Sequence, residues 1–419
     1  MTDTDATALI ADMGARARAA ARIMAAAPTA QKGAALRAAA DELRTRAVAI
    51  LAANATDMAR ATSGGLAPAL LDRLRLDDAR LAAIADALDT VALLPDPVGQ
   101  CIDTRTPANG IALSRVRVPL GVIGIVYESR PNVTVDAGAL CLMSGNAVIL
   151  RGGSEATASN AALHAALAAG LLAADLPADA VQLVDTTDRA AVGAMLAAAG
   201  LIDVLIPRGG KALVARVQAD ARVPVLAHLD GNNHIYVHSA AEPAMAEAIV
   251  VNAKLRRTGV CGAMETLLID SGFPAAETLV AALIDAGCTL RGDGRAQAID
   301  ARIAPATGDD WDTEYLDAIA AVAIVDGPDA AIAHIAAHGS GHTDAILTDD
   351  EAVAERFLAT VDSAIVLHNA STQFADGGEF GLGAEIGIAT GRLHARGPVA
   401  LEGLTTYKWI GRGSGQVRA

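Results

Sequence analysis

The chain has few aromatic residues and a deficit of positive charge. Phe, Tyr and Trp make up 2% of its 419 residues, which leaves little material for the aromatic platforms on which single-stranded nucleic acids stack. Asp and Glu number 48 against 33 Lys and Arg, and the formal net charge of −15 repels polyanions at long range. The sequence therefore predicts no nucleic-acid partner, and an anionic ligand would need a local group of basic residues.

Patterns typical of disulfide and metal proteins are also missing. The four cysteines include no CxxC pair, so we expect neither a disulfide framework nor a zinc ribbon. His334, His338 and His342 lie four residues apart, but no Glu follows the first of them as in HExxH, and Gly339 and Gly341 end a helix before the third. We therefore expect no metal at this run of histidines, and no metal site elsewhere in the chain.

No stretch has the length and hydropathy of a membrane span. The richest apolar run, residues 161–174, consists mainly of Ala and contains His164. Residues 1–28 hold several Asp residues and no apolar core, unlike a secretion signal. With 53% hydrophobic and 19% charged residues, the sequence is typical of a folded protein, which we expect in the cytoplasm and without a membrane partner.

Helical and strand patterns divide the chain into a helical start and two βα series. Residues 4–90 show helical spacing of apolar residues, whereas residues 91–119 are broken by Pro and Gly and contain an exposed strand at 111–118, which predicts a protruding hairpin. Short apolar runs then alternate with helical stretches, a pattern typical of parallel sheets covered on both faces. We expect strands at 122–127, 147–150, 181–184, 204–206, 223–226, 233–237, 266–269, 322–325, 344–347 and 364–367.

Two glycine turns follow predicted strands of the first series. Neither GxGxxG nor a Walker sequence occurs, but Arg151-Gly152-Gly153-Ser154 and Arg208-Gly209-Gly210-Lys211 each precede a predicted helix. Glycine lets the backbone approach a ligand, a helix N-terminus presents N–H groups, and the basic residues add charge. The pair predicts a phosphate-binding site, and the alternative is a pair of turns beside solvated basic residues.

One cysteine lies where a substrate could reach it. Cys261 occupies a loop between a predicted helix and a predicted strand, flanked by glycines and close in sequence to Arg256 and Arg257, whose charges favour a thiolate. Cys141, among Ala and Leu residues, is expected to be inert packing. Cys261 is therefore either a nucleophile or an unreactive loop thiol, and no His is placed by the sequence as its base.

Longer stretches resemble one family, the glutamate-5-semialdehyde dehydrogenases, also called γ-glutamyl phosphate reductases, of the aldehyde dehydrogenase superfamily. The resemblance runs essentially from end to end. Its most specific stretches are RVPLGVIGIVYESRPNVTVDAGALCLMSGNAVILRGGSEA (117–156), VCGAMETLL (260–268), EYLDAIAAVAIVD (314–326), HGSGHTDAI (338–346) and FADGGEFGLGAEIGIATGRLHARGP (374–398).

The resemblance implies an aldehyde dehydrogenase-like α/β fold. Such a fold has a Rossmann-like cofactor domain, an α/β catalytic domain and a small oligomerisation hairpin. In this sequence the cofactor domain would comprise residues 1–103 and 120–227, and the catalytic domain residues 228–369. The hairpin and tail would comprise residues 104–119 and 384–419, with residues 370–383 as a Gly-rich return segment to the cofactor domain.

The resemblance also implies an activity: NADPH-dependent reduction of L-glutamate 5-phosphate to L-glutamate 5-semialdehyde with release of phosphate, the second step of proline biosynthesis. By position, Cys261 is the thiol that attacks the acyl phosphate and forms a thioester, and Asn132 donates to the oxyanion. A homo-oligomer is implied as well, and a glutamate 5-kinase is a possible partner.

The residues implied for the cofactor, NADPH or NADP⁺, include both glycine turns. Residues 151–154 stand where hydrolytic members have Lys-Pro-Ala-Glu, whose glutamate would repel the 2′-phosphate of NADPH. In its absence Ser154 and Arg151 can bond to that phosphate. Residues 208–211 would lie near the pyrophosphate, and Glu314 matches the glutamate that holds the nicotinamide ribose. The candidates for binding the substrate are Arg130, Lys254, Arg256, Arg257, Phe380 and Arg396.

Some positions depart from related sequences. The glutamate base of hydrolytic members is absent from residues 228–233, which would protect a thioester from water. Asp230 could act as a shorter base, so a hydrolytic aldehyde dehydrogenase stays an alternative, as does a non-catalytic α/β binding protein. Gly262 and Thr258 stand where the family commonly has Asn and Pro, and Asn233 stands where many members have Cys.

Overall fold

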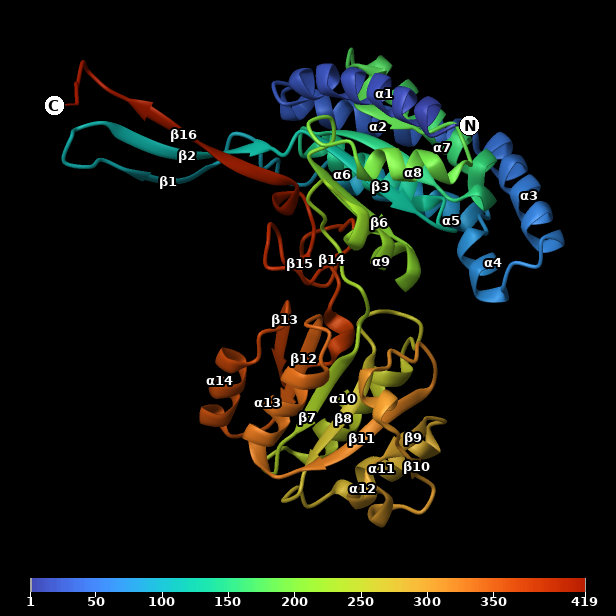
Figure 1. Ribbon diagram of the computed structural model, residues 1–419, viewed down its shortest axis with the longest axis vertical. Coiled ribbons are helices and arrows are strands. Elements are labelled where there is room, and N and C mark those ends of the chain that lie inside the picture. The colour runs from blue at the N-terminus through green and yellow to red at the C-terminus, as the bar shows by residue number, and fades with distance from the viewer. Residues whose placement is uncertain (1, 419) are drawn as a thin grey trace. The chain divides into compact units, whose positions relative to one another are not determined.

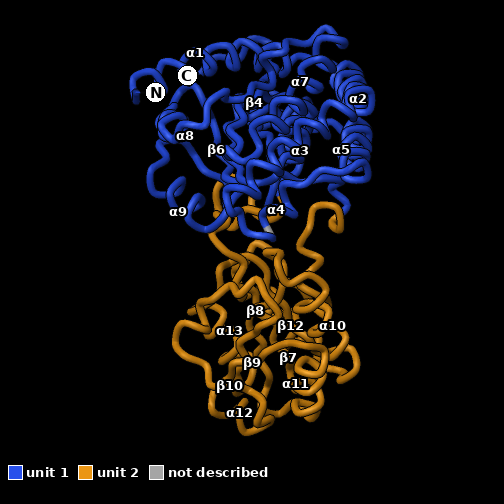
Figure 2. The backbone as a smooth tube through the Cα atoms, turned by 90° about the vertical axis from the view of Figure 1, so that its right-hand side faces the viewer, with its two compact units in different colours: residues 1–227, 381–387, 399–419 blue, residues 228–380, 388–398 orange. Residues whose placement is uncertain are grey.

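The computed structural model describes residues 2–418, which form two units. Of the described residues, one unit comprises 2–227, 381–387 and 399–418, and the other 228–380 and 388–398 (Figure 2). The predicted return segment is therefore divided after Phe380, and residues 388–398 of the predicted tail belong to the second unit. Each unit has its own parallel sheet.

The first unit begins with the predicted helices. They are α1 (Asp3–Met24), α2 (Thr29–Thr45), α3 (Ala47–Ser63), α4 (Pro68–Leu74) and α5 (Asp78–Val91). Helix α1 starts with a capping box in which the Thr2 hydroxyl accepts a hydrogen bond from the N–H of Asp5, and the Asp5 carboxylate accepts one from the N–H of Thr2. The apolar side of these helices is built mostly of Ala and Leu, so they pack closely.

The parallel sheet of the first unit has the strand order β5-β4-β3-β6. Its strands are β3 (Val122–Tyr127), β4 (Ala147–Gly152), β5 (Val181–Leu183) and β6 (Val204–Arg208), and its helices are α6 (Asn132–Met143), α7 (Thr157–Ala173), α8 (Arg189–Leu196) and α9 (Lys211–Asp220), with short 3₁₀ turns η1 (Ser154–Ala156) and η2 (Ala178–Ala180). These strands confirm four of the predicted runs.

The predicted strand at 223–226 is wrong. Val225 makes only an isolated bridge with Leu205, whose N–H donates to the Pro224 carbonyl while the N–H of Leu226 donates back to Leu205. Pro224 has no N–H to extend the ladder.

Helix α7 with η1, Ser154–Ala173, is long and apolar enough by length and composition to cross a membrane, although 44% of that window is buried. It packs on α2 and α3 of the same unit.

The predicted hairpin is part of a three-stranded antiparallel sheet. Strands β1 (Cys101–Arg105) and β2 (Ala112–Pro119) form the hairpin, and β16 (Thr405–Arg412) pairs along the full length of β2. Figure 1 shows the three strands extending away from the helices of the first unit. The C-terminal segment is thus joined to the hairpin, although the two are far apart in the sequence.

The second unit has a seven-stranded parallel sheet of order β10-β9-β11-β8-β7-β12-β13. Its strands are β7 (Asn233–Val237), β8 (Met264–Asp270), β9 (Thr289–Gly292), β10 (Ala304–Pro305), β11 (Ile319–Val325), β12 (Thr343–Leu347) and β13 (Ile365–His368). Its helices are α10 (Pro243–Leu255), α11 (Ala276–Asp285), α12 (Gly294–Ile299), α13 (Gly327–His338) and α14 (Glu351–Thr360), with η3 (Gly308–Asp312) and η4 (Thr372–Phe374). The five predicted strands of this series are confirmed, and the short strands β9 and β10 were missed.

The remaining short elements lie near the C-terminus. They are the paired strands β14 (Ile388–Ala389) and β15 (Gly397–Pro398), and the 3₁₀ turn η5 (Glu402–Leu404).

Candidate active site

Cys261 lies in the loop between α10 and β8, as the sequence predicts, and its side chain is half-buried. It packs against an apolar cluster of Ile365, Ala375 and Ile388. The other three cysteines differ in setting: Cys101 is exposed on β1, whereas burial raises the pKa of Cys141 and raises that of Cys288 to about 11. Cys261 is therefore the thiol that combines access with a structured environment.

The Cys261 loop is held by Asn233, the first residue of β7. Its Nδ2 atom donates to the carbonyls of Cys261 at 2.6 Å and Ala263 at 2.8 Å, and its Oδ1 atom accepts from the N–H of Thr343 at 3.1 Å. Asn233 therefore connects the β7, β8 and β12 segments at one edge of the sheet. In the sequence this residue stands out only as a departure from Cys, because the segments that it joins are distant in the chain.

Gly231 lies directly against the Cys261 backbone. A Cβ atom at this position would be 2.2 Å from the Cys261 carbonyl oxygen, so no side chain fits without moving the loop. The N–H of Gly231 donates to Glu314 Oε1 at 3.0 Å. Glu314, predicted to hold the nicotinamide ribose, is thus in hydrogen-bond contact with the segment that supports the thiol loop.

Gln373 of η4 braces the start of the same loop. Its Nε2 atom donates to the carbonyls of Ala253 at 2.9 Å and Arg257 at 3.1 Å, and its Oε1 atom accepts from Arg256 at 3.4 Å. Gln373 was not among the predicted site residues, because no motif in the sequence marks its role.

The Gly262 departure has a local explanation. A Cβ atom there would lie 3.1 Å from the carbonyl oxygen of Thr372, a contact that leaves little room for a side chain. Gly262 therefore suits the close approach of η4 to the thiol loop.

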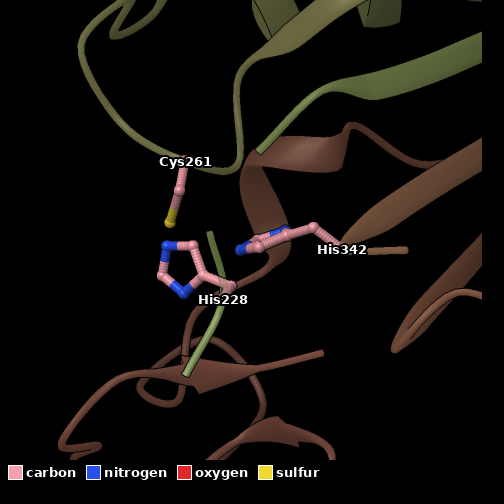
Figure 3. A group of neighbouring side chains, drawn as sticks. All are labelled: His228, Cys261 and His342. Atoms are coloured by element: carbon pink, nitrogen blue, oxygen red, sulfur yellow. The ribbon is translucent and has the colours of Figure 1, made fainter. Parts of the chain in front are cut away.

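Two histidines meet the thiol. The ligand atoms of His228, Cys261 and His342 all lie within 4.8 Å of one another, and Figure 3 shows both rings directed toward the sulfur. His228 Nδ1 donates to the Ile388 carbonyl at 2.8 Å, and the two rings meet edge to face with centroids 5.0 Å apart. His342 is fully buried, and burial lowers its pKa to about 3, so its ring is neutral at physiological pH.

The histidines that share helical spacing do not form this group. His338 Nδ1 lies 2.9 Å from an Asp312 carboxylate oxygen, and the His334 ring packs against Trp311. Within residues 2–418, the one group of three or more His, Cys, Asp or Glu ligand atoms this close together is that of His228, Cys261 and His342. The spacing that drew attention to His342 was thus unrelated to its tertiary partners.

The two Arg-Gly-Gly turns lie at the same edge of the first unit's sheet. Tyr127, the last residue of β3, pairs with Gly152 of β4 on one side and with Arg208 of β6 on the other. Both turns therefore flank the end of the central strand, at the carboxyl edge where parallel sheets bind ligands. The N–H of Gly210 donates to a Glu128 carboxylate oxygen at 3.1 Å, which shows that this helix start can hold an anionic group.

Arg151 and Ser154 have different surroundings. Arg151 is buried and donates to the carbonyls of Gly152 and Thr187, both at 2.9 Å, and burial lowers its pKa. Ser154 is exposed, and its carbonyl accepts from Arg60 of α3 at 2.9 Å. Arg60, which also forms an ion pair with the buried Asp57 at 2.6 Å, is a second guanidinium beside the turn. The sequence could not indicate this, because Arg60 lies 94 residues before Ser154.

Asn132 is the first residue of α6. Its Nδ2 atom donates to Asp136 Oδ2 at 2.8 Å, and burial raises the pKa of Asp136 to about 6, opposed by that bond and by Arg208. Because the amide NH₂ group carries two hydrogens, the bond to Asp136 orients it and leaves it able to donate a second bond. Arg130, half-buried, precedes α6.

The predicted substrate-binding residues of the second unit differ in exposure and in ion pairing. Arg256, Arg257 and Phe380 are exposed. Lys254 is fully buried, with Nζ 2.5 Å from Glu265 Oε2, and Arg396 donates to an Asp362 carboxylate oxygen at 2.6 Å and to the Asp362 carbonyl at 2.7 Å. The expectation that Lys254 presents a charge to a ligand does not fit this burial: its ammonium group balances Glu265 instead.

Known proteins resemble this chain over nearly its whole length. The model of the aldehyde dehydrogenase family matches residues 3–310. A gamma-glutamyl phosphate reductase from Rhizorhabdus wittichii is 70% identical over 414 residues, which are 99% of this chain and 96% of that protein. The crystal structure of the gamma-glutamyl phosphate reductase from Thermotoga maritima is 42% identical with a TM-score of 0.95, covering 98% of this chain and 100% of that one.

More distant structures share the fold alone. An engineered glycolyl-CoA reductase with bound NADP⁺ is 16% identical, with a TM-score of 0.68 and a coverage of 96% for both chains.

Proposed function

Because the chain belongs to the aldehyde dehydrogenase family, and within it to the gamma-glutamyl phosphate reductases, we propose that it reduces L-glutamate 5-phosphate to L-glutamate 5-semialdehyde and phosphate, the second step of proline biosynthesis. The observation that carries this proposal is the setting of Cys261. Its half-buried thiol stands on a loop fixed by Asn233 and by the close approach of Gly231.

Cys261 acts as the nucleophile. Its Sγ atom attacks the acyl carbon, the C–S bond forms, and the C–O bond to phosphate breaks with its electrons leaving on phosphate. A nicotinamide cofactor, when bound, supplies a hydride to the resulting thioester carbon. The C–S bond then breaks, which releases the aldehyde and returns the thiolate.

Negative charge collects on the substrate oxygen in both tetrahedral stages. Asn132, oriented by Asp136, and the N–H of Cys261 are the proposed donors to that oxygen. Loss of one such donor typically lowers the rate about 100- to 1000-fold.

NADPH is the proposed form of the cofactor. The Nε atoms of Arg151 and Arg208 are buried without a hydrogen-bond partner, so the two turns hold guanidinium groups with unused donors at the carboxyl edge of the sheet. Residues 151–154 together with Arg60 would hold the 2′-phosphate, residues 208–211 the pyrophosphate, and Glu314 the nicotinamide ribose.

The Arg60→Ala variant tests this cofactor proposal. A charge-assisted bond to a 2′-phosphate contributes about 1.5 to 3 kcal/mol, so the KM for NADPH should rise at least about 10-fold. The KM for NADH, which lacks that phosphate, should stay within about twofold. Steady-state kinetics with both cofactors measure the difference, and an equal change in both KM values would remove Arg60 from the site.

The substrate's two anionic ends require cations near the thiol. Arg256 and Arg257, exposed at the end of α10, are the proposed partners in the second unit, with Arg130 from the first and Phe380 as an apolar wall. Lys254 is left out of this set because it is fully buried against Glu265, and Arg396 because both of its terminal nitrogens bond to Asp362.

We also propose that the chain forms a homo-oligomer through the β1-β2-β16 sheet. In the described residues β1 is exposed throughout and β2 is covered only in part. A three-stranded sheet with so little burial gains stability from a covering surface.

A glutamate 5-kinase is the proposed source of the acyl phosphate.

The reverse reaction provides the direct test. Purified protein should reduce NADP⁺ with glutamate 5-semialdehyde only when inorganic phosphate is present, and Cys261→Ala should abolish that activity. Activity without phosphate would instead indicate the hydrolytic alternative with Asp230 as base. A complete lack of activity in the wild type would favour the non-catalytic alternative.

A further inference from the structure

Three potential metal ligands converge in the second unit from segments that are far apart in the chain. His228 precedes β7, Cys261 precedes β8 and His342 immediately precedes β12. Because these three parallel strands are neighbours in the sheet, their amino ends bring the side chains to one edge. The two imidazole nitrogens and the sulfur lie within 4.8 Å of one another (Figure 3).

Both imidazoles are oriented as metal-binding imidazoles commonly are. His228 Nδ1 is bonded to the Ile388 carbonyl at 2.8 Å, and His342 Nδ1 to Thr343 Oγ1 at 2.9 Å. Such outer partners fix the ring and leave Nε2 as the ligand atom. In both rings Nε2 is therefore the nitrogen that would bind a metal between the two histidines and Cys261.

His342 gives an independent indication of a ligand. Its side chain is fully buried, and its Nε2 atom has no hydrogen-bond partner. A buried polar nitrogen without a partner is unfavourable, and a bound cation would satisfy it. In Figure 3 this ring points toward the space between His228 and the Cys261 sulfur.

We propose that His228, Cys261 and His342 bind one Zn²⁺ ion, which reversibly blocks the nucleophile. Two imidazole nitrogens and one thiolate are a donor set that Zn²⁺ favours, and three protein ligands leave a fourth position open. Binding replaces the thiol proton, which passes to solvent. While the sulfur electron pair is donated to zinc, it is not available for attack on a carbonyl carbon.

The geometry requires only small adjustments. Zn–N bonds of about 2.0 Å and a Zn–S bond of about 2.3 Å place tetrahedral ligand atoms roughly 3.3 to 3.5 Å apart. The side chains already lie within 4.8 Å of one another, so they need to approach by no more than about 1.5 Å. The half-buried Cys261 side chain leaves a route for the ion.

Zinc binding is measured on the full chain with Cys101→Ser as the background, because Cys101 is exposed and could bind metal on its own. Equilibrium dialysis should give one Zn²⁺ per chain, and Co²⁺ in its place should show a sulfur-to-cobalt charge-transfer band. In that background His342→Gln should weaken zinc binding at least about 100-fold, and Cys261→Ser should remove the band.

His338→Gln is the matched control. His338 is the same residue type four positions earlier, it bonds to Asp312, and it lies outside the group of three. Its variant should bind zinc with unchanged affinity. If His342→Gln does not fold, Thr343→Val removes only the partner of Nδ1 and should weaken zinc binding about 10- to 100-fold.

Alkylation gives a readout that needs no substrate. Zn²⁺ should slow the reaction of Cys261 with iodoacetamide, and a chelator should restore the rate. The proposal is overturned if zinc leaves this rate unchanged, or if His342→Gln and His338→Gln bind zinc equally well. These outcomes do not depend on whether the protein reduces an acyl phosphate, so the two proposals fail separately.

Discussion

Single residues fix the position of the thiol in this protein. Asn233 holds the carbonyls on both sides of Gly262, and Gly231 allows the preceding segment to touch the Cys261 carbonyl. Asn233 makes hydrogen bonds to three backbone groups. Its removal would lower the stability of the fold, because each backbone group left buried without a partner costs about 1 to 3 kcal/mol of free energy. The reactive atom is thus positioned by residues that perform no chemistry themselves.

Gly231→Ala tests this positioning. The new Cβ atom would lie 2.2 Å from the Cys261 carbonyl oxygen, so the thiol loop must move. A displacement of about 1 Å at a reacting atom can lower the rate about 100-fold, and we expect a fall in kcat of that size.

Gly259→Ala is the control in the same loop, since a Cβ atom there meets nothing within 4 Å. Steady-state kinetics and thermal unfolding of both variants separate misplacement from instability. Equal kcat values for the two variants would show that the close approach at Gly231 has no bearing on the reaction.

At the scale of elements, the two sheets place their functional residues at opposite ends of their strands. The Arg-Gly-Gly turns follow β4 and β6 at the carboxyl edge, where ligands of parallel sheets are expected. In the second unit the thiol loop and His342 precede β8 and β12, at the amino edge. A search of the carboxyl ends alone therefore finds the cofactor candidates and misses the histidines.

Helix α6 carries a buried carboxylate whose ionisation should affect stability. Burial raises the pKa of Asp136 to about 6, so the folded protein binds a proton there more tightly than the unfolded chain, whose Asp titrates near 3.8. The contribution of Asp136 to stability is therefore present below about pH 4 and declines as the pH rises to about 6.

Asp136→Asn removes this decline while keeping an acceptor for Asn132. The variant should be more stable than the wild type at pH 8, by up to about 3 kcal/mol for a shift of this size, and the gain should shrink toward pH 4. Urea unfolding at several pH values measures the difference. A gain independent of pH would mean that charge burial is not its cause.

At the scale of the whole molecule, the β1-β2-β16 sheet exposes two aromatic side chains that lie next to each other on β16. Tyr407 and Trp409 are 47% and 45% exposed, beneath the guanidinium groups of Arg115 and Arg105. Arg and aromatic side chains are enriched in protein interfaces. Because only 2% of the residues are aromatic, two of them side by side on one exposed sheet indicate an interface there.

Trp409→Asp should therefore dissociate the proposed oligomer. A buried charge in an interface is strongly unfavourable, so light scattering should show a smaller species than the wild type. Val48→Asp, at a site 85% exposed on α3, should leave the mass unchanged. A wild type that is monomeric, or a Trp409→Asp variant with the wild-type mass, would contradict the assembly proposal.

Local sequence patterns predicted the order of most elements, the thiol loop and the family. Short continuous or alternating apolar runs indicated most strands, because such patterns are local. The stretches around Cys261 and at residues 117–156 carried the resemblance to the family. The strand predicted at 223–226 was wrong, and the short strands β9 and β10 were missed. Weak local patterns do not reveal which strand a run will pair with.

The side chains that surround the thiol come from segments that are distant in the chain, so local patterns could not identify them. Cys261 is reached by His228, His342 and Asn233 only because β7 lies between β8 and β12. No local sequence pattern indicates this strand order. For the same reason Lys254, which looked like a surface cation, is buried against Glu265. Contacts between distant segments depend on how the sheet is assembled, so motifs locate the nucleophile while the fold selects its neighbours.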